Sequence, residues 1–247
     1  VAIWMLFTNR LVVKFTRTMS FAPDWAVIRE LFRFGLPAGV QGIAMNIAGV
    51  TLVSFIGSLP ESAEAQAAYA VGYTELFSMI SWTSSGLMGA TAAVAGQNLG
   101  AHKPDRAAQA PFAGAKIGLC VAAVIGGAFV LIPGPLLGLF NLNDGVAGQI
   151  GRQLLSYLAV SGFLITIALS FTGALQGTGD TKSPLYITIV SQVIVPIGIC
   201  TLFSSLRPLQ SGDIWLAIVC GHFTRATLSV LRFRQGAWRN IKVTAPA

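Results

Sequence analysis

The stretch AGQNLGAHKPDRA, residues 95–107, is a short polar segment between two long apolar runs, and it decides the fold. A second stretch of the same kind, GALQGTGDTKSP, covers residues 173–184. Each contains glycines at which a helix can end and the backbone can bend tightly, followed by Asp and Pro residues at which the next helix can begin. Both stretches are therefore predicted to be turns between membrane-spanning helices.

The composition is that of a membrane protein. Apolar residues make up 54% of the 247 residues and charged residues only 10%, against about 25% charged residues in soluble domains. Three cysteines, Cys120, Cys200 and Cys220, lie inside apolar runs without paired spacing. They are expected to be small buried apolar residues and not disulfide partners or metal ligands.

Six apolar runs reach the length of about 20 residues that a helix needs to cross the hydrocarbon core of a bilayer. Gly, Pro, Asn or Asp residues bound each run. The runs cover residues 36–56, 73–95, 111–132, 154–174, 185–203 and 214–231. The predicted fold is an all-α membrane protein with a bundle of six transmembrane helices.

The Lys and Arg residues indicate the orientation of the bundle. Twelve of the 16 fall in segments on one side, Arg152 and Arg207 fall on the other, and Lys116 and Arg225 lie within spans. Because cytoplasmic loops carry an excess of Lys and Arg, both ends of the bundle are predicted to be cytoplasmic. This placement explains the net charge of +7 through contact with anionic lipid, so nucleic acid is not an expected partner.

The remaining segments flank the six-helix lobe, which is predicted to cover residues 36–231. Residues 1–16 are expected to be the end of a preceding transmembrane helix, residues 17–35 a cytoplasmic connection, and residues 232–247 a cytoplasmic tail. Within the connection, residues 23–34 predict a short amphipathic helix that Asp24 caps. Such a helix is expected to lie along the membrane surface.

Glycine pairs and prolines indicate how the helices pack and bend. Pairs spaced four apart allow helix backbones to approach closely in lipid. Pro37 is expected in the first turn of its helix, where it is harmless, whereas Pro196 lies within a span and is expected to kink it. The pairs are Gly35/Gly39, Gly96/Gly100, Gly114/Gly118, Gly134/Gly138 and Gly173/Gly177.

Taken together, these motifs resemble the multidrug and toxic compound extrusion family of membrane antiporters. The resemblance lies in the order and spacing of the motifs over roughly residues 30–240. The matching stretches are GLPAGVQ at 35–41, GYTE at 72–75, GQNLG at 96–100 with DRA at 105–107, LQGTGDT at 175–181, and LRFR at 231–234 with Gly236 and Trp238.

The resemblance implies that this chain is the second of two six-helix lobes, with an N-terminal lobe as its partner. Such a transporter would alternate the access of a central cavity between the two sides of the membrane, driven by inward movement of H⁺ or Na⁺. In one branch of the family, acids on the first and fourth helices of this lobe take part in coupling. Met45 and Ile165 occupy those positions here, so coupling by that route is not expected.

Glu75 is the acid that lies closest inside a span, and it is the candidate cation-coupling residue. It could bind a proton or attract a cationic substrate, or it could be an acid favoured by the first turn of a helix. Met79 and Trp82 share a helical face with Glu75, and Tyr73 precedes them. These flexible and aromatic groups are candidate substrate contacts, with ordinary packing as the alternative.

Amide side chains within the spans form a second candidate group. Gln41 and Asn46, with Met45 between them, lie on the first span, and Gln192 lies beside Pro196 on the fifth. Because unpaired amides are costly in hydrocarbon, they are expected to line either a substrate cavity or a helix contact.

Other polar residues within the spans and turns have simpler interpretations. His222 and Arg225 share a face of the last span, where they could relay protons, reach toward the inner interface or pair locally. Lys116 is expected to reach the interface in the same way. Asp105 and Asp180 are interpreted as caps at helix starts.

These features favour a secondary active transporter without cofactors that exports organic, often cationic, amphiphiles from the bacterial plasma membrane. A flippase for lipid-linked saccharides and a non-transporting fragment are the alternatives. Membrane lipid, an organic cation and H⁺ or Na⁺ are the expected partners. An enzyme is rejected because the two histidines, His102 and His222, have no metal-ligand or catalytic cluster beside them.

Overall fold

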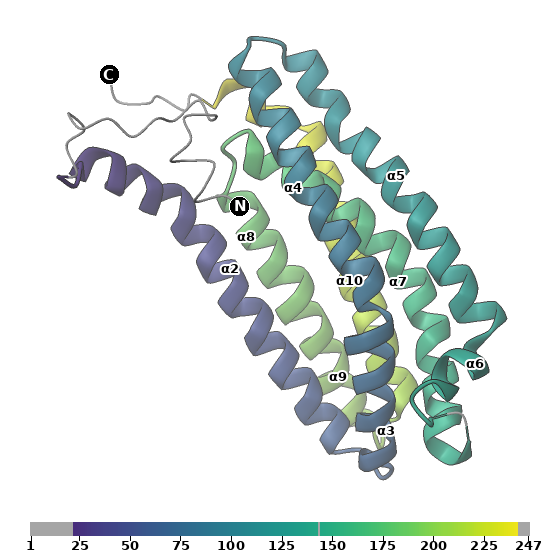
Figure 1. Ribbon diagram of the computed structural model, residues 1–247. Helices are drawn as coiled ribbons and strands as arrows, with labels where there is room; N and C mark the ends of the chain where they lie inside the picture. The colour runs from purple at the N-terminus through teal and green to yellow at the C-terminus, as the bar shows by residue number, and fades with distance from the viewer. Residues whose placement is uncertain (1–21, 143, 242–247) are drawn as a thin grey trace. The chain divides into compact units, whose positions relative to one another are not determined.

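The computed structural model describes residues 22–142 and 144–241. They divide into two compact units, of which residues 22–33 belong to the first and residues 34–241 to the second. The second unit, called the lobe from here on, contains the helices from α3 onward and most of α2 (Figure 1). The predicted end of a preceding helix at 1–16, the first part of the connection and the end of the tail lie outside the described residues.

The elements are helices throughout the described ranges. In chain order they are α2 (Trp25–Gly57), α3 (Ser62–Tyr69), η1 (Ala70–Leu76), α4 (Ser78–Gly100), α5 (Pro104–Leu131), α6 (Pro133–Gly138), α7 (Gly145–Gly177), α8 (Lys182–Thr188), η2 (Ile189–Ile194), α9 (Val195–Leu206), α10 (Ser211–Arg234) and η3 (Ala237–Asn240). The segments η1 and η2 are π-helical and η3 is a 3₁₀ helix.

The predicted short amphipathic helix and the first predicted span form one helix, α2. Asp24 starts it as expected, since its carboxylate accepts hydrogen bonds from the backbone N–H groups of Ala26 and Val27 at 2.9 and 3.2 Å. The expected end of the first helix at Phe34 was wrong, because helical hydrogen bonding continues to Gly57. Pro37 is therefore a residue of the helix interior and not of its first turn.

All six predicted spans fall within helical segments. Five helices within residues 22–142 and 144–241 are long and apolar enough to cross a membrane: α2, α5, α7, the continuous helix Lys182–Leu206 and α10. The predicted span at 73–95, which lies in η1 and α4, is not among these five. It carries serines, threonines and glycines at many positions, which lower its hydropathy.

Helix α7 lies at the centre of the lobe, where it packs against α4, α5 and α10 (Figure 1). Close approach depends on two of the predicted glycine pairs. A Cβ atom added to Gly173 or Gly177 would collide with the α4 backbone at Met88 or Ala92, and one at Gly118 would collide with Thr166 of α7. Gly35 and Gly39 have nothing within 4 Å, so this pair makes no close helix contact in the lobe.

The two polar turns lie where the sequence predicts them, between α4 and α5 and between α7 and α8. In the first turn, however, the left-handed residue is His102 (φ 57°), whereas Gly100 is still helical. In the second turn Gly179 takes that conformation (φ 93°). The expectation that glycine makes the tight bend is therefore correct for the second turn only.

Asp180 combines the expected capping role with an ion pair. Its carboxylate accepts hydrogen bonds from the backbone N–H and the hydroxyl of Ser183 at 3.1 and 2.8 Å. It also pairs with Arg232 of α10 at 3.0 Å. Asp105 lies in the first turn of α5 and not at its cap, and it pairs with Arg239 at 3.3 Å.

Candidate functional site

A cavity of about 160 Å³ lies between four helical segments of the lobe. Its walls come from α2, from α3 with η1, from η2 with α9, and from α10. The lining residues are Met45, Ala48, Gly49, Leu52, Tyr69, Tyr73, Gln192, Pro196, Ile218 and His222. The lining is mainly apolar and aromatic with a few polar groups, which is the usual composition of a small-molecule site.

Two π-helical segments border this cavity, and each contributes a lining side chain. Tyr73 lies on η1, where the N–H of Phe77 donates to the carbonyl of Gly72 at 2.9 Å, and Gln192 lies on η2. Pro196 follows η2 and has no N–H to donate to the carbonyl of Gln192. At the position where the sequence predicted a kink, the helix has a π-helical segment directly before Pro196. Such segments occur often at functional sites.

A row of aromatic rings connects the α3–η1 wall to α10. Tyr69 stacks on Trp215 and on Tyr73 with ring centroids 6.1 and 4.9 Å apart. The row continues from Tyr73 to Phe77 at 5.4 Å and from Phe77 to the imidazole of His222 at 5.9 Å. This row makes the wall of the cavity between η1 and α10 aromatic.

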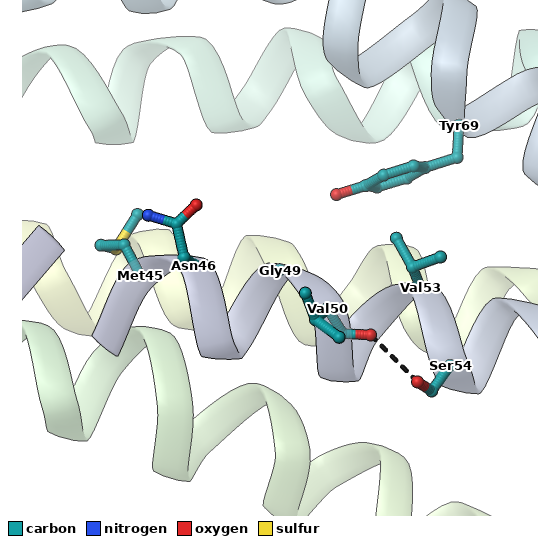
Figure 2. Close-up of a pocket in the computed structure, with 7 residues that line it drawn as sticks. All are labelled: Met45, Asn46, Gly49, Val50, Val53, Ser54 and Tyr69. Carbon is teal, nitrogen blue, oxygen red and sulfur yellow. Dashed lines mark hydrogen bonds between the residues drawn. The ribbon is translucent and has the colours of Figure 1, made fainter. Parts of the chain in front are cut away.

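An outer groove of about 520 Å³ adjoins the cavity and shares Met45, Gly49 and Tyr69 with it. Figure 2 shows that the Tyr69 side chain points across the groove toward α2. Asn46 lines this groove, and its amide donates to the carbonyl of Gly42 within the same helix at 2.9 Å. Because they share these three residues, the cavity and the groove together are called the recess on α2 from here on.

Four of the residues predicted to bind substrate line this recess. Met45, Tyr73 and Gln192 line the cavity, and Asn46 lines the groove. Gln41 makes a helix contact instead, which was one of its two predicted roles. Its amide donates to the hydroxyl of Thr188 at 2.8 Å and accepts from the amide of Gln176 at 3.2 Å.

Glu75, Met79 and Trp82 lie apart from the recess. All three are exposed on the surface of the lobe, with exposures of 57% for Met79 and 77% for Trp82. Their exposed side chains do not line the cavity that Tyr73 lines. Tyr73 and Glu75 are two residues apart, and side chains at this spacing leave a helix in different directions.

His222 and Arg225 are buried, with exposures of 2% and 5%. The low exposure of Arg225 shows that most of its side chain lies between helices. The Arg225 side chain lies close enough to Tyr73 and to His222 to interact with both electrostatically. Lys116, in contrast, is exposed on α5. Of the cysteines, Cys200 is buried, whereas Cys120 is exposed and Cys220 is intermediate.

Sequence reasoning missed Tyr69 and most of the apolar lining. Tyr69 precedes the predicted start of the second span at Tyr73, so it was assigned to a loop. The spacing of four residues between Tyr69 and Tyr73 was the available signal, because it places both rings on one helical face.

Residues 37–202 match the model of the MatE family. This chain belongs to the MatE family. It is 29% identical over 226 residues to a probable multidrug resistance protein NorM of Xanthomonas campestris, and this match covers 91% of the chain and 48% of the relative. A second protein of the same name, from Thermotoga maritima, is 22% identical over 216 residues, or 87% of the chain and 46% of that relative. The chain thus spans about half the length of these curated relatives.

Solved structures of MatE transporters share the fold of the lobe. An outward-facing multidrug resistance MATE family transporter of the MOP superfamily matches 96% of the chain and 53% of its own chain, with a TM-score of 0.84 and 21% identity. A MOP superfamily transporter from Pyrococcus furiosus matches 97% of the chain and 53% of its own, with a TM-score of 0.79 and 21% identity. The predicted helical membrane lobe is confirmed by this agreement.

Proposed function

We propose that this chain is one lobe of a cation-coupled antiporter that exports organic, often cationic, amphiphiles by alternating access. The observation that carries the proposal is the recess on α2. It consists of a cavity with aromatic walls and an adjoining groove, in a chain of the MatE family. Relatives at 22–29% identity carry the name of multidrug resistance proteins. A recess with methionine and aromatic walls suits varied apolar ligands.

The two π-helical segments are the proposed moving parts of the lobe. Transporters place substrates beside helices whose regular hydrogen bonding is interrupted. Here η1 and η2 interrupt two neighbouring helices on opposite walls of one cavity. A change between π-helical and α-helical hydrogen bonding there would turn Tyr73 and Gln192 relative to the recess, and this would open or close it.

Glu75 is the proposed coupling residue of this lobe, with H⁺ or Na⁺ as the ion. Movement of one charge inward supplies about 2.3 kcal/mol per 100 mV. No acid stands at the two positions that the resemblance implied, since Met45 lines the cavity and Ile165 is buried in the core. Coupling would therefore use the exposed carboxylate of Glu75 or an acid of a first lobe.

The proposed setting is the bacterial inner membrane, with both ends of the lobe cytoplasmic, surrounding lipid and an N-terminal lobe as partners. The support is the excess of Lys and Arg on one side and the half-length match to the relatives. The proposed sixth crossing is formed by η1 and α4, supported by the match of 96% of the chain to a solved transporter.

Efflux from everted membrane vesicles tests this function. The chain would be joined to the first lobe of the Xanthomonas campestris relative, and uptake of a fluorescent organic cation would be followed under a proton or a sodium gradient. We expect gradient-dependent uptake that falls at least fivefold in Gln192→Leu and stays unchanged in Gln109→Leu, an exposed amide of α5.

The coupling role of Glu75 needs its own pair of variants in the same vesicles. Glu75→Gln is expected to abolish the dependence on the gradient, whereas Glu61→Gln, at another exposed acid, is expected to preserve it. Absence of gradient-dependent uptake in the parent fusion would contradict the proposed function. Equal dependence in both variants would remove Glu75 from it.

One observation favours the alternative of a lipid-linked saccharide flippase, because such a protein would need a cationic cavity for its phosphate groups. Arg225 is buried on α10, three residues after His222 of the cavity wall, and Lys116 is exposed on α5. Flipping of a fluorescent lipid-linked saccharide in liposomes, without efflux of the organic cation, would favour this second function.

A further inference from the structure

Polar side chains line the outer groove without an acidic or basic group among them. In the described part of the chain, the polar residues of this lining are Asn46, Ser54 and Tyr69, and the others are methionine, glycine and valine. A charged ligand in the groove would therefore meet hydrogen-bonding groups and not an opposite charge. What the groove can recognise depends on which donors and acceptors these three side chains leave unused.

Hydrogen bonds within α2 orient two of these side chains. The amide nitrogen of Asn46 donates to the carbonyl of Gly42 at 2.9 Å, and the hydroxyl of Ser54 donates to the carbonyl of Val50 at 3.0 Å, as Figure 2 shows for the second bond. Because a carbonyl oxygen only accepts, the amide must turn its nitrogen toward Gly42 and its oxygen away from it. Figure 2 shows the amide oxygen of Asn46 on the side of Tyr69. Both side chains therefore keep an oxygen that can accept a hydrogen bond from a ligand.

Tyr69 supplies a further oxygen from the opposite wall of the groove. Its ring stacks on two aromatic neighbours, with centroids 4.9 and 6.1 Å apart, and its hydroxyl extends toward α2 (Figure 2). Met45 and Gly49, which flank Asn46 in the sequence, line both the groove and the cavity together with Tyr69. The Tyr69 hydroxyl and the Asn46 amide oxygen therefore belong to the same part of the groove, where it adjoins the cavity.

We propose that the amide oxygen of Asn46 and the hydroxyl oxygen of Tyr69 form a binding site for the N–H group of a protonated amine. An ammonium N–H donates charge-assisted hydrogen bonds, which are about twice as strong as those between neutral groups. The apolar body of the ligand would lie against Met45, Val50 and Val53 of α2. This site rests on the proposed function, since it names the group by which the recess would recognise an organic cation.

The site predicts a preference between organic cations of equal charge. A tertiary ammonium ion has one N–H to donate, whereas a quaternary ion has a methyl group in its place. In an apolar groove without acceptors, the quaternary ion would bind at least as well, because an N–H that leaves water without a new partner pays a desolvation penalty. A preference for the tertiary ion therefore depends on the acceptor oxygens and not on charge or apolar contact.

Benzyldimethylammonium and benzyltrimethylammonium are a matched pair of probes, because they differ by one methyl group in place of the N–H. Their affinities for the protein purified in detergent would be measured by calorimetry at neutral pH, where the tertiary amine is protonated. We expect the tertiary ion to bind at least fivefold more tightly than the quaternary ion. Equal affinities, or a preference for the quaternary ion, would overturn the proposal.

Two variants locate the N–H group of the ligand. Tyr69→Phe removes the hydroxyl and keeps the stacked ring, and Asn46→Leu removes the amide oxygen. Each is expected to lower the ratio of tertiary to quaternary affinity at least threefold, whereas the affinity for the quaternary ion should change less than twofold because the groove stays intact. Tyr186→Phe, at a tyrosine of α8 that is 63% exposed, should keep the parent ratio. An unchanged ratio in Tyr69→Phe or in Asn46→Leu would overturn the assignment.

Failure of this site and failure of the proposed function give different results. Equal affinities of the two ammonium ions, together with gradient-dependent uptake in the vesicles, would refute the N–H site and leave the transport function in place. A preference for the tertiary ion that Tyr69→Phe removes, without gradient-dependent uptake, would support the site and contradict the transport function.

Discussion

Replacement of Gly173 by Ala tests how the lobe is held together around α7. The added Cβ would lie 2.9 Å from the carbonyl carbon and 3.0 Å from the Cα of Met88 on α4, with the carbonyl oxygen closer still. Ordinary contact begins at 3.4 Å, so the carbonyl oxygen of Met88 would have to retreat by about 1 Å. Backbone atoms cannot rotate away as a flexible side chain can, so the two helices must separate.

The size of the effect follows from two opposing terms. Overpacking a close contact costs up to about 3 kcal/mol, whereas alanine gains about 1 kcal/mol over glycine in a helix interior. The expected net loss for Gly173→Ala is therefore about 2 kcal/mol. Gly127→Ala on α5 is the matched control, because nothing lies within 4 Å of its added Cβ, and it should gain up to about 1 kcal/mol.

Thermal unfolding of the purified protein measures both variants. At about 2–4 °C per kcal/mol for a chain of this size, Gly173→Ala should lower the Tm by about 4–8 °C, while Gly127→Ala should leave it unchanged or raise it slightly. Equal Tm values for the two variants would show that α4 and α7 are not in backbone contact at this point, and the packing argument would fail.

Two further predictions concern polar contacts between helices. Gln41→Leu should lower stability by about 1–3 kcal/mol, because it leaves a buried hydroxyl on α8 without its partner; Asn46→Leu, whose hydrogen bond stays within α2, should change it far less, and equal losses in thermal unfolding would contradict this reasoning. Arg232→Met should cost about 1 kcal/mol, since it leaves the buried carboxylate of Asp180 unpaired. Arg239→Met, at an exposed pair, should have no measurable effect, and the reverse order in chemical unfolding would refute the assignment.

The sequence predicts the helices and their connections well because hydropathy and turn chemistry are local properties. The turn at residues 173–184 and its capping Asp180 are examples, since each depends on residues adjacent in the chain. The continuity of α2 was not predicted, because Gly35 and Pro37 are typical of a helix boundary. Only the backbone hydrogen bonding shows that the helix begins at Trp25.

The site was harder to predict because it depends on which helices meet. Tyr73, Met79 and Trp82 all lie on the second predicted span, yet Tyr73 lines the cavity and the other two are exposed. The sequence of one span does not show which of its faces meets the neighbouring helices. The burial of Arg225 was likewise hidden, since a long basic side chain usually reaches the interface and its enclosure depends on helices distant in sequence.

Protection of a cysteine by substrate tests the central claim that the recess on α2 binds the transported compound. In a variant whose three native cysteines are replaced, Met45→Cys would be alkylated with and without a fluorescent organic cation, beside Ile117→Cys on the exposed face of α5. The account predicts that the cation slows alkylation at position 45 at least fivefold and leaves position 117 unchanged. Equal rates at position 45 with and without the cation would contradict it.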